Sequence, residues 1–208
     1  FDQPLDNWAE LVVATGFFDR AGITLLTDVH ENTSYGPLKR ALVKIGMEET
    51  FHLRHGEVWM RRLSKAGGEA KEMVQRCVDW MFPMTIEWFG LPDDMKRHSG
   101  QLDYKLKGLT NDQLRQVWMA STVPLCEQLG LDAPAHWDEE KGEYVLDYPF
   151  PCQYNEEEKR WMFEEGEISW DTVFKRWKGR GPMNEIYVES VQRSRGDVKR
   201  LLNGKSVA

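Results

Sequence analysis

Two long segments near the start of the chain carry apolar residues at helical spacing. Asp6 or Asn7 is suited to cap a helix that continues to about His30. Pro37 is suited to the first turn of a second helix, which continues to about Ala66. On each helix, positions separated alternately by four and three residues form a stripe along one face. In the first helix the stripe comprises Trp8, Val12, Thr15, Asp19, Gly22, Leu26 and Val29. In the second helix it comprises Leu38, Leu42, Ile45, Glu49, His52, Gly56, Trp59 and Leu63. Two long helices with a short connection predict an antiparallel hairpin.

Shorter elements are expected after this hairpin. In chain order they are a helix over 69–89 kinked at Pro83, a loop over 91–108, a helix from the capping-box sequence at Thr110 to about Gly130, a strand hairpin within 137–148, a mostly helical acidic stretch over 156–177 broken near Gly166, a turn at 179–182, and a helix from 184 to about 202. The pattern predicts a mainly α protein. We expect one helical bundle over 1–130 and an extension over 131–208, packed on the bundle or on a partner.

Composition excludes several classes of protein. The chain has 208 residues, of which 41% are hydrophobic and 29% charged, so it is globular rather than disordered. Its formal net charge of −7 argues against a dedicated nucleic-acid binder. No apolar run reaches the roughly 18 residues of a membrane-spanning helix. Nine Trp and nine Met indicate a bulky core or a large apolar pocket.

The cysteines and the first residue bear on cellular context. Cys77, Cys126 and Cys152 are widely spaced and lack a Cys-x-x-Cys motif, which favours reduced thiols in a cytoplasmic protein. The sequence begins at Phe1, close to the first expected helix, and shows no signal peptide. We therefore expect that a segment upstream of Phe1 is not represented.

Ionisable residues interrupt the apolar stripes of the first two helices. Asp19 lies on the first stripe, and Glu49 and His52 lie three residues apart on the second. Burying a carboxylate is costly unless it is paired, hydrogen-bonded or bound to a metal. A Glu-x-x-His pair is the inward-facing ligand motif of di-iron carboxylate bundles, which use two such pairs and two single carboxylates. This chain contains half of that set.

Two interpretations of these three residues remain open. They are either metal ligands or a polar network that fixes the register of the two helices. A lone Glu-x-x-His motif is common by chance, and the facing Asp19 strengthens the metal interpretation. Glu48 and Asp28 are expected either to be solvated or to contact the ligand residues without binding the metal themselves.

Several separated motifs resemble one known family. The motifs are Phe17-Phe-Asp-Arg-Ala-Gly22, Thr33-Ser-Tyr-Gly-Pro37, Lys44-Ile-Gly-Met-Glu-Glu-Thr-Phe-His52, Leu106-Lys-Gly-Leu-Thr-Asn-Asp-Gln-Leu-Arg115, Thr122-Val-Pro124, His136-Trp-Asp-Glu-Glu-Lys-Gly-Glu-Tyr144 and Gly179-Arg-Gly-Pro-Met-Asn184. In their order and spacing, over nearly the whole length of the chain, they resemble the oxygenase (A) subunits of phenylacetyl-CoA epoxidases.

The resemblance implies a ferritin-like di-iron carboxylate bundle that epoxidises the aromatic ring of an aryl-CoA thioester such as phenylacetyl-CoA with O2. It implies a flavin and iron–sulfur reductase as electron donor and a ferritin-like partner subunit without metal. Asp19, Glu49 and His52 fall on the family's ligand positions. Lys107 and Asn111 fall near positions that hold the phosphate-bearing part of coenzyme A, and a helix start favours anions. The alternative for Lys107 is an ordinary solvated lysine.

The sequence departs from this family because the other half of the ligand set is absent. The remaining ligands lie upstream of Phe1, come from a partner, or have been lost; we favour the first.

We consider three kinds of protein: a catalytic oxygenase subunit, a related aryl-CoA oxygenase, or a non-catalytic structural subunit. Ligand type does not decide iron against manganese. The C-terminal third either covers a partner or is ordinary core and solvated helix.

Overall fold

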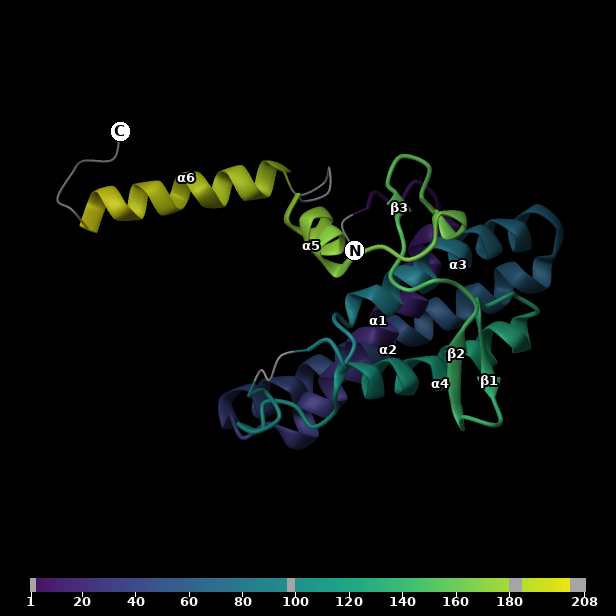
Figure 1. Ribbon diagram of the computed structural model, residues 1–208, viewed down its shortest axis with the longest axis horizontal. Helices are drawn as coiled ribbons and strands as arrows, with labels where there is room; N and C mark the ends of the chain where they lie inside the picture. The colour runs from purple at the N-terminus through teal and green to yellow at the C-terminus, as the bar shows by residue number, and fades with distance from the viewer. Residues whose placement is uncertain (1–2, 97–99, 180–184, 203–208) are drawn as a thin grey trace. The chain divides into compact units, whose positions relative to one another are not determined.

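The computed structural model describes residues 3–96, 100–179 and 185–202 (Figure 1). The described part of the chain contains six α-helices and two short strand pairs, which confirms the mainly α prediction. It divides into two compact units. One comprises residues 5–168, and the other comprises the segments before and after that range.

The predicted helical hairpin is confirmed. Helices α1 (Trp8–Asn32) and α2 (Gly36–Ala66) run side by side in Figure 1 and make the most extensive contact between two elements of the fold. The side chain of Asn7 caps α1 by accepting a hydrogen bond from the backbone N–H of Glu10 at 3.0 Å. Pro37 lies in the first turn of α2, where its missing N–H costs no hydrogen bond.

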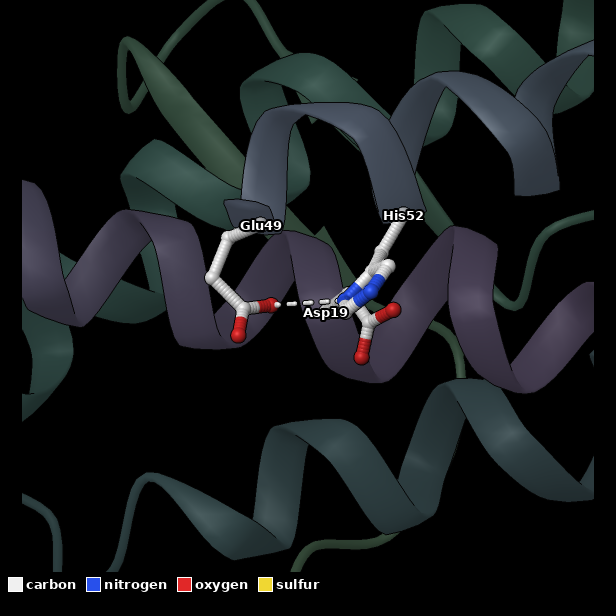
Figure 2. A group of neighbouring side chains, drawn as sticks. All are labelled: Asp19, Glu49 and His52. Carbon is white, nitrogen blue, oxygen red and sulfur yellow. Dashed lines mark ion pairs between the residues drawn. The ribbon is translucent and has the colours of Figure 1, made fainter. Parts of the chain in front are cut away.

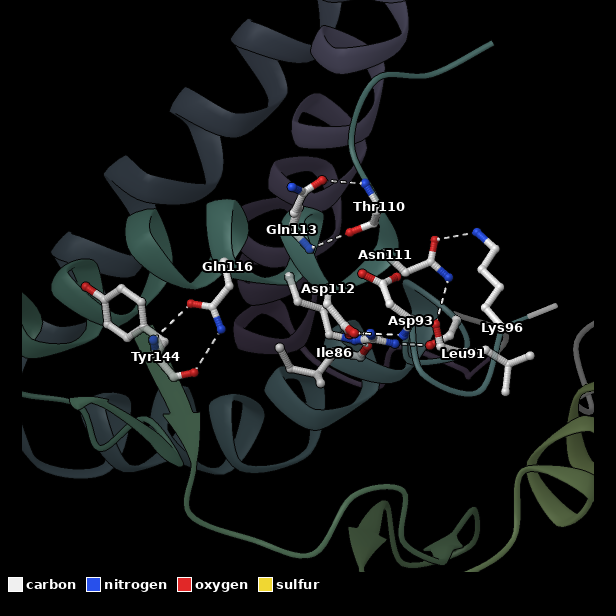
Figure 3. Close-up of polar contacts among 12 residues, drawn as sticks. Ile86, Leu91, Asp93, Lys96, Thr110, Asn111, Asp112, Gln113, Gln116 and Tyr144 are labelled. Carbon is white, nitrogen blue, oxygen red and sulfur yellow. Dashed lines mark hydrogen bonds and ion pairs between the residues drawn. The ribbon is translucent and has the colours of Figure 1, made fainter. Parts of the chain in front are cut away.

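Helices α3 (Gly68–Trp88) and α4 (Asn111–Leu129) close the core against α1. The capping box at Thr110 is present, since Thr110 and Gln113 bond each other's backbone N–H groups (Figure 3). Phe17, Phe82 and Trp118 meet edge to face, and all three are fully buried. The Trp118 indole N–H donates to the backbone oxygen of Phe17 at 3.1 Å, which attaches α4 to α1.

The predicted strand hairpin is also present. Strands β1 (Ala135–Asp138) and β2 (Glu143–Leu146) pair antiparallel. The Gln116 side-chain amide bonds both the N–H and the C=O of Tyr144, each at 2.9 Å, so the hairpin is fixed to α4 (Figure 3).

The helical prediction for 156–169 is wrong. This stretch contains the pair β3 (Tyr154–Asn155) and β4 (Arg160–Trp161), followed by the short 3₁₀ helix η1 (Phe163–Glu165). The Asn155 side chain accepts hydrogen bonds from the N–H groups of Glu157 and Glu158, which makes a turn where a helix would begin. Trp161 is buried and donates its indole N–H to the backbone oxygen of Trp80 at 2.8 Å. Tertiary burial therefore overrides the helix propensity of the glutamates.

The second unit contains α5 (Trp170–Gly179) and α6 (Glu185–Leu202). The aromatic rings along α5 contact one another, and that of Trp177 meets those of Trp170 and Phe174 edge to face. The final helix is confirmed from Glu185 onward. Of the turn expected at 179–182, residues 180–182 lie outside the described residues. No helix in the described ranges is both long and apolar enough to span a membrane.

Candidate metal centre

The hairpin of α1 and α2 brings together the three predicted ligands. Asp19 comes from α1, and Glu49 and His52 come from successive turns of α2 (Figure 2). One donor atom from each side chain lies within 4.8 Å of the others. The His52 Nδ1 atom lies 3.7 Å from the Glu49 Oε2 atom, which is an ion-pair distance rather than a hydrogen bond. Asp19 and Glu49 are half-buried, whereas His52 is exposed.

The electrostatics of this cluster favour a bound cation. Burial raises the pKa of the Asp19 carboxyl, and the neighbouring Glu49 carboxylate raises it further; His52 opposes both effects. Two carboxylates that share a partly desolvated site repel each other unless a positive charge lies between them. A divalent metal ion would supply that charge.

The donor set fits a transition metal. Two carboxylates and one imidazole are ligands that suit iron, manganese or zinc, and three protein ligands leave coordination positions open. All three residues lie on the helices of one hairpin and none lies on a loop, so helix packing controls their spacing. The geometry therefore supports a metal-ligand interpretation.

The predicted inner stripes do not point into the core as expected. On α2 only Leu42 and Gly56 of the predicted stripe are buried, and Leu38, Ile45 and His52 are exposed. On α1 the stripe member Val12 is buried but Trp8 is 45% exposed. The core-facing side of α1 is instead centred on residues such as Val13, Phe17 and Ala21. The ligand cluster consequently lies at the edge of the α1–α2 contact.

Lys107 is not an ordinary solvated lysine. It is 9% exposed, and its Nζ atom donates to the Asn111 Oδ1 atom at 2.8 Å. Lys96 Nζ approaches the same oxygen at 3.4 Å, and the Asn111 amide donates to the Leu91 backbone oxygen (Figure 3). Burial lowers the pKa of Lys107, and Lys96 lowers it further, whereas Asp28 and Asp93 oppose the shift. A bound anion would offset the unfavourable burial of the Lys107 ammonium.

A cavity of about 320 Å³ adjoins Lys107 and Asn111. Its walls are mostly apolar and include Leu25 and Val29 of α1, together with Trp88 near the end of α3. A cavity with a cationic group and an amide on one side and apolar walls on the other suits a ligand that has both an anionic and an apolar part.

Asp28 is a supporting residue whose role the sequence did not predict. It is 4% exposed, and its carboxylate accepts hydrogen bonds from the backbone N–H groups of Gly108 and Leu109. It therefore fixes the loop that carries Lys107 to α1. These two loop partners lie about eighty residues away in the sequence, so no local signal reveals them. Glu48 is solvated, as expected, and pairs with Lys44 at 3.9 Å.

A mainly α fold with carboxylate and histidine ligands on a helical hairpin is typical of ferritin-like proteins. The sequence matches the family described as phenylacetic acid catabolic protein over residues 1–178, and the chain belongs to this ferritin-like family. It is also 31% identical over 198 residues to the A subunit of 1,2-phenylacetyl-CoA epoxidase from Escherichia coli (strain K12). That similarity covers 93% of this chain, and the chain spans 58% of the length of this curated relative.

Proposed function

We propose that this chain belongs to the catalytic oxygenase subunit of a multicomponent di-iron monooxygenase. Its reaction is epoxidation of the aromatic ring of phenylacetyl-CoA with O2 in phenylacetate catabolism. The observation that carries the proposal is the convergence of Asp19, Glu49 and His52 within 4.8 Å. Membership of the phenylacetic acid catabolic family and the similarity to an epoxidase subunit support the substrate class.

The spacing within the cluster favours ligands over a register-fixing network. Such a network would stabilise the hairpin through hydrogen bonds. Among the described residues, no side-chain hydrogen bond joins Asp19, Glu49 and His52, and the ion pair between His52 and Glu49 spans 3.7 Å. Donor atoms that converge without bonding one another are arranged for a shared ion.

Bound iron would supply redox chemistry with O2 at this point of the fold. The role of Asp19, Glu49 and His52 is to hold the metal from one side. A di-iron centre needs more carboxylate and histidine ligands than α1 and α2 provide, so the proposal requires helices beyond this hairpin. Within the core on the α1 and α2 side, Phe17 and Met60 are fully buried, so water is excluded from this part of the helix contact.

We assign Lys107 and Asn111 to the phosphate-bearing part of the coenzyme A thioester. Asp28 fixes their loop to α1 nine residues after Asp19. At 1.5 Å per residue, these positions are separated by roughly 14 Å along the helix. A flexible thioester arm held by phosphate contacts at one end could therefore deliver its aryl group toward the cluster at the other.

The test is metal content combined with turnover. After anaerobic loading with ferrous iron, elemental analysis should find about two iron atoms per chain in a complete catalytic subunit. With a flavin and iron–sulfur reductase, the loaded complex should convert phenylacetyl-CoA to a ring epoxide. Iron near zero would favour a non-catalytic ferritin-like subunit. Faster turnover of a different aryl-CoA thioester would favour a related oxygenase.

A further inference from the structure

The two helices that carry the cluster meet at a pair of glycines one turn away. Gly16 lies three residues before Asp19 on α1, and Gly56 lies four residues after His52 on α2. Gly56 is buried against the α1 backbone. A Cβ atom added to Gly56 would lie 2.5 Å from the Gly16 nitrogen and 2.8 Å from the Thr15 carbonyl carbon. The backbones therefore approach as closely as the absence of a side chain permits.

A polar contact joins the two helices next to the same crossing. Arg20, the neighbour of Asp19, is buried and forms an ion pair with Glu57, the neighbour of Gly56. The Arg20 guanidinium also donates to the backbone oxygen of Gly16 at 3.3 Å and to that of Ser121 on α4 at 3.5 Å. The Arg20 guanidinium therefore contacts α1, α2 and α4 together, and it fixes the positions of these helices relative to one another at the crossing.

The separation of the helices at this crossing decides whether the three ligands can share an ion. Ligand atoms lie roughly 2 Å from a transition metal, so two ligands of one ion are no more than about 4 Å apart. The donor atoms of the cluster span up to 4.8 Å, which small side-chain adjustments can close. Nonbonded carbon atoms prefer about 3.5–4.0 Å, so a methyl group on Gly56 would move the backbones apart by about 1 Å.

We propose that Gly56, in contact with Gly16, is a positioning residue that holds Asp19 within metal-binding distance of Glu49 and His52. This inference rests on the proposed metal function and adds a residue that touches neither metal nor substrate. It also explains why a helix interior keeps glycine, a poor helix former, at its closest contact.

Other glycines in the chain provide matched controls. Gly46 on α2 and Gly22 on α1 are helical, and a Cβ atom at either would meet nothing within 4 Å. At Gly16 an added Cβ atom would meet the Met60 sulfur at 2.5 Å, which is the flexible end of a side chain rather than backbone. The expected damage is therefore large for Gly56→Ala, intermediate for Gly16→Ala and small for Gly46→Ala and Gly22→Ala.

The experiment is titration of the complete catalytic subunit, and of these four variants of it, with Co²⁺ under anaerobic conditions. The visible absorption of bound Co²⁺ reports its coordination, and far-UV circular dichroism reports helix content. We expect Gly56→Ala to bind Co²⁺ at least tenfold more weakly, with an altered spectrum and unchanged helix content. The two control variants should bind within twofold of the parent protein.

Parent-like Co²⁺ affinity and spectrum in Gly56→Ala would overturn the inference and leave the proposed function intact. A parent protein that binds neither Co²⁺ nor ferrous iron would overturn the proposed function, and the inference with it. If Gly56→Ala does not fold, Gly16→Ala decides the question. An unchanged affinity in that variant then counts against the inference, and a several-fold loss with a changed spectrum supports it.

Discussion

The carboxylate of Asp28 accepts a hydrogen bond at 3.0 Å from the backbone N–H of Gly108, eighty residues further along the chain. The same carboxylate accepts from Leu109 and from the Asn32 side chain. This buried acceptor is the connection between α1 and the loop that carries Lys107.

We predict that Asp28→Ala destabilises the protein by about 3 kcal/mol, because the loop N–H groups lose a charged acceptor without gaining water. For a chain of this size, the loss corresponds to a fall in Tm of roughly 6–12 °C. Calorimetry measures the change. Asp94→Ala, at an exposed position of the preceding loop, is the control and should change Tm little. Equal effects of the two substitutions would contradict the role of Asp28.

Glu49→Ala should abolish turnover and iron binding while the fold survives. The Glu49 side chain is half-buried at the edge of the helix contact and pairs only weakly with His52, so its removal leaves no cavity in the core. We expect a change in stability of less than about 1 kcal/mol. Elemental analysis and an oxygen-uptake assay provide the readouts. The adjacent Glu48→Ala removes an exposed carboxylate of the same helix and should leave both unchanged. Normal iron content in Glu49→Ala would refute the ligand assignment.

Lys107→Met should change the pH dependence of stability in a defined direction. The folded pKa of Lys107 lies below its ordinary value of 10.5, because the buried ammonium is poorly solvated. The buried Lys107 ammonium therefore destabilises the folded state fully at pH values below its pKa in the folded protein. This destabilisation decreases as the pH rises and is absent above pH 10.5. The parent protein should gain stability relative to Lys107→Met as the pH rises through the lowered pKa of Lys107 toward 10.5. Urea unfolding at several pH values measures this difference.

The same substitution tests substrate binding. At pH 7.5 we expect Lys107→Met to raise the KM for phenylacetyl-CoA by about tenfold, because a charge-assisted contact to phosphate is lost. Lys65→Met, at an exposed position of α2, should leave KM unchanged. A KM effect of equal size in both variants would indicate general electrostatic attraction rather than a site at Lys107.

Lys159→Met should destabilise the contact between the start of α1 and the β3–β4 hairpin. The Lys159 ammonium lies 2.6 Å from Asp6 and 2.8 Å from Glu10, and Glu10 is 7% exposed. Removing the ammonium leaves a buried carboxylate with less compensation, at a cost of about 2–4 kcal/mol. Thermal unfolding reports the loss. Lys141→Met removes an exposed partner of Asp138 on the other hairpin and should cost less than about 1 kcal/mol.

The sequence predicted those elements whose signals are local. The cap at Asn7, the capping box at Thr110 and the hairpin around Gly142 each depend on residues a few positions apart, and the structure contains all three. The proximity of Asp19 to Glu49 and His52 was also predictable, because two adjacent helices with a short connection must pack together. The ligand role of these residues stays a prediction.

What the sequence did not predict depends on long-range partners. The glutamates at 156–158 favour a helix locally, but the buried Trp161 and its bond to Trp80 impose a strand pair. The predicted stripe on α2 has the spacing of a buried helix face. Which face of α2 is buried depends, however, on the other helices that pack against it. Tyr154 and Trp161 are core residues of their unit, which favours ordinary core over a partner surface for this part of the C-terminal third.

The three cysteines are buried, and burial raises the pKa of Cys77 and Cys126 to about 12 in each case. At neutral pH these thiols stay protonated, and the thiolate is the form that oxidants and alkylating agents attack. A protein that handled dioxygen and its reduced products would therefore keep the Cys77 and Cys126 thiols unreactive for as long as it stayed folded. Modification of these thiols would then occur only in molecules that had unfolded locally or globally. The rate of modification would therefore report the rate at which the protein unfolds.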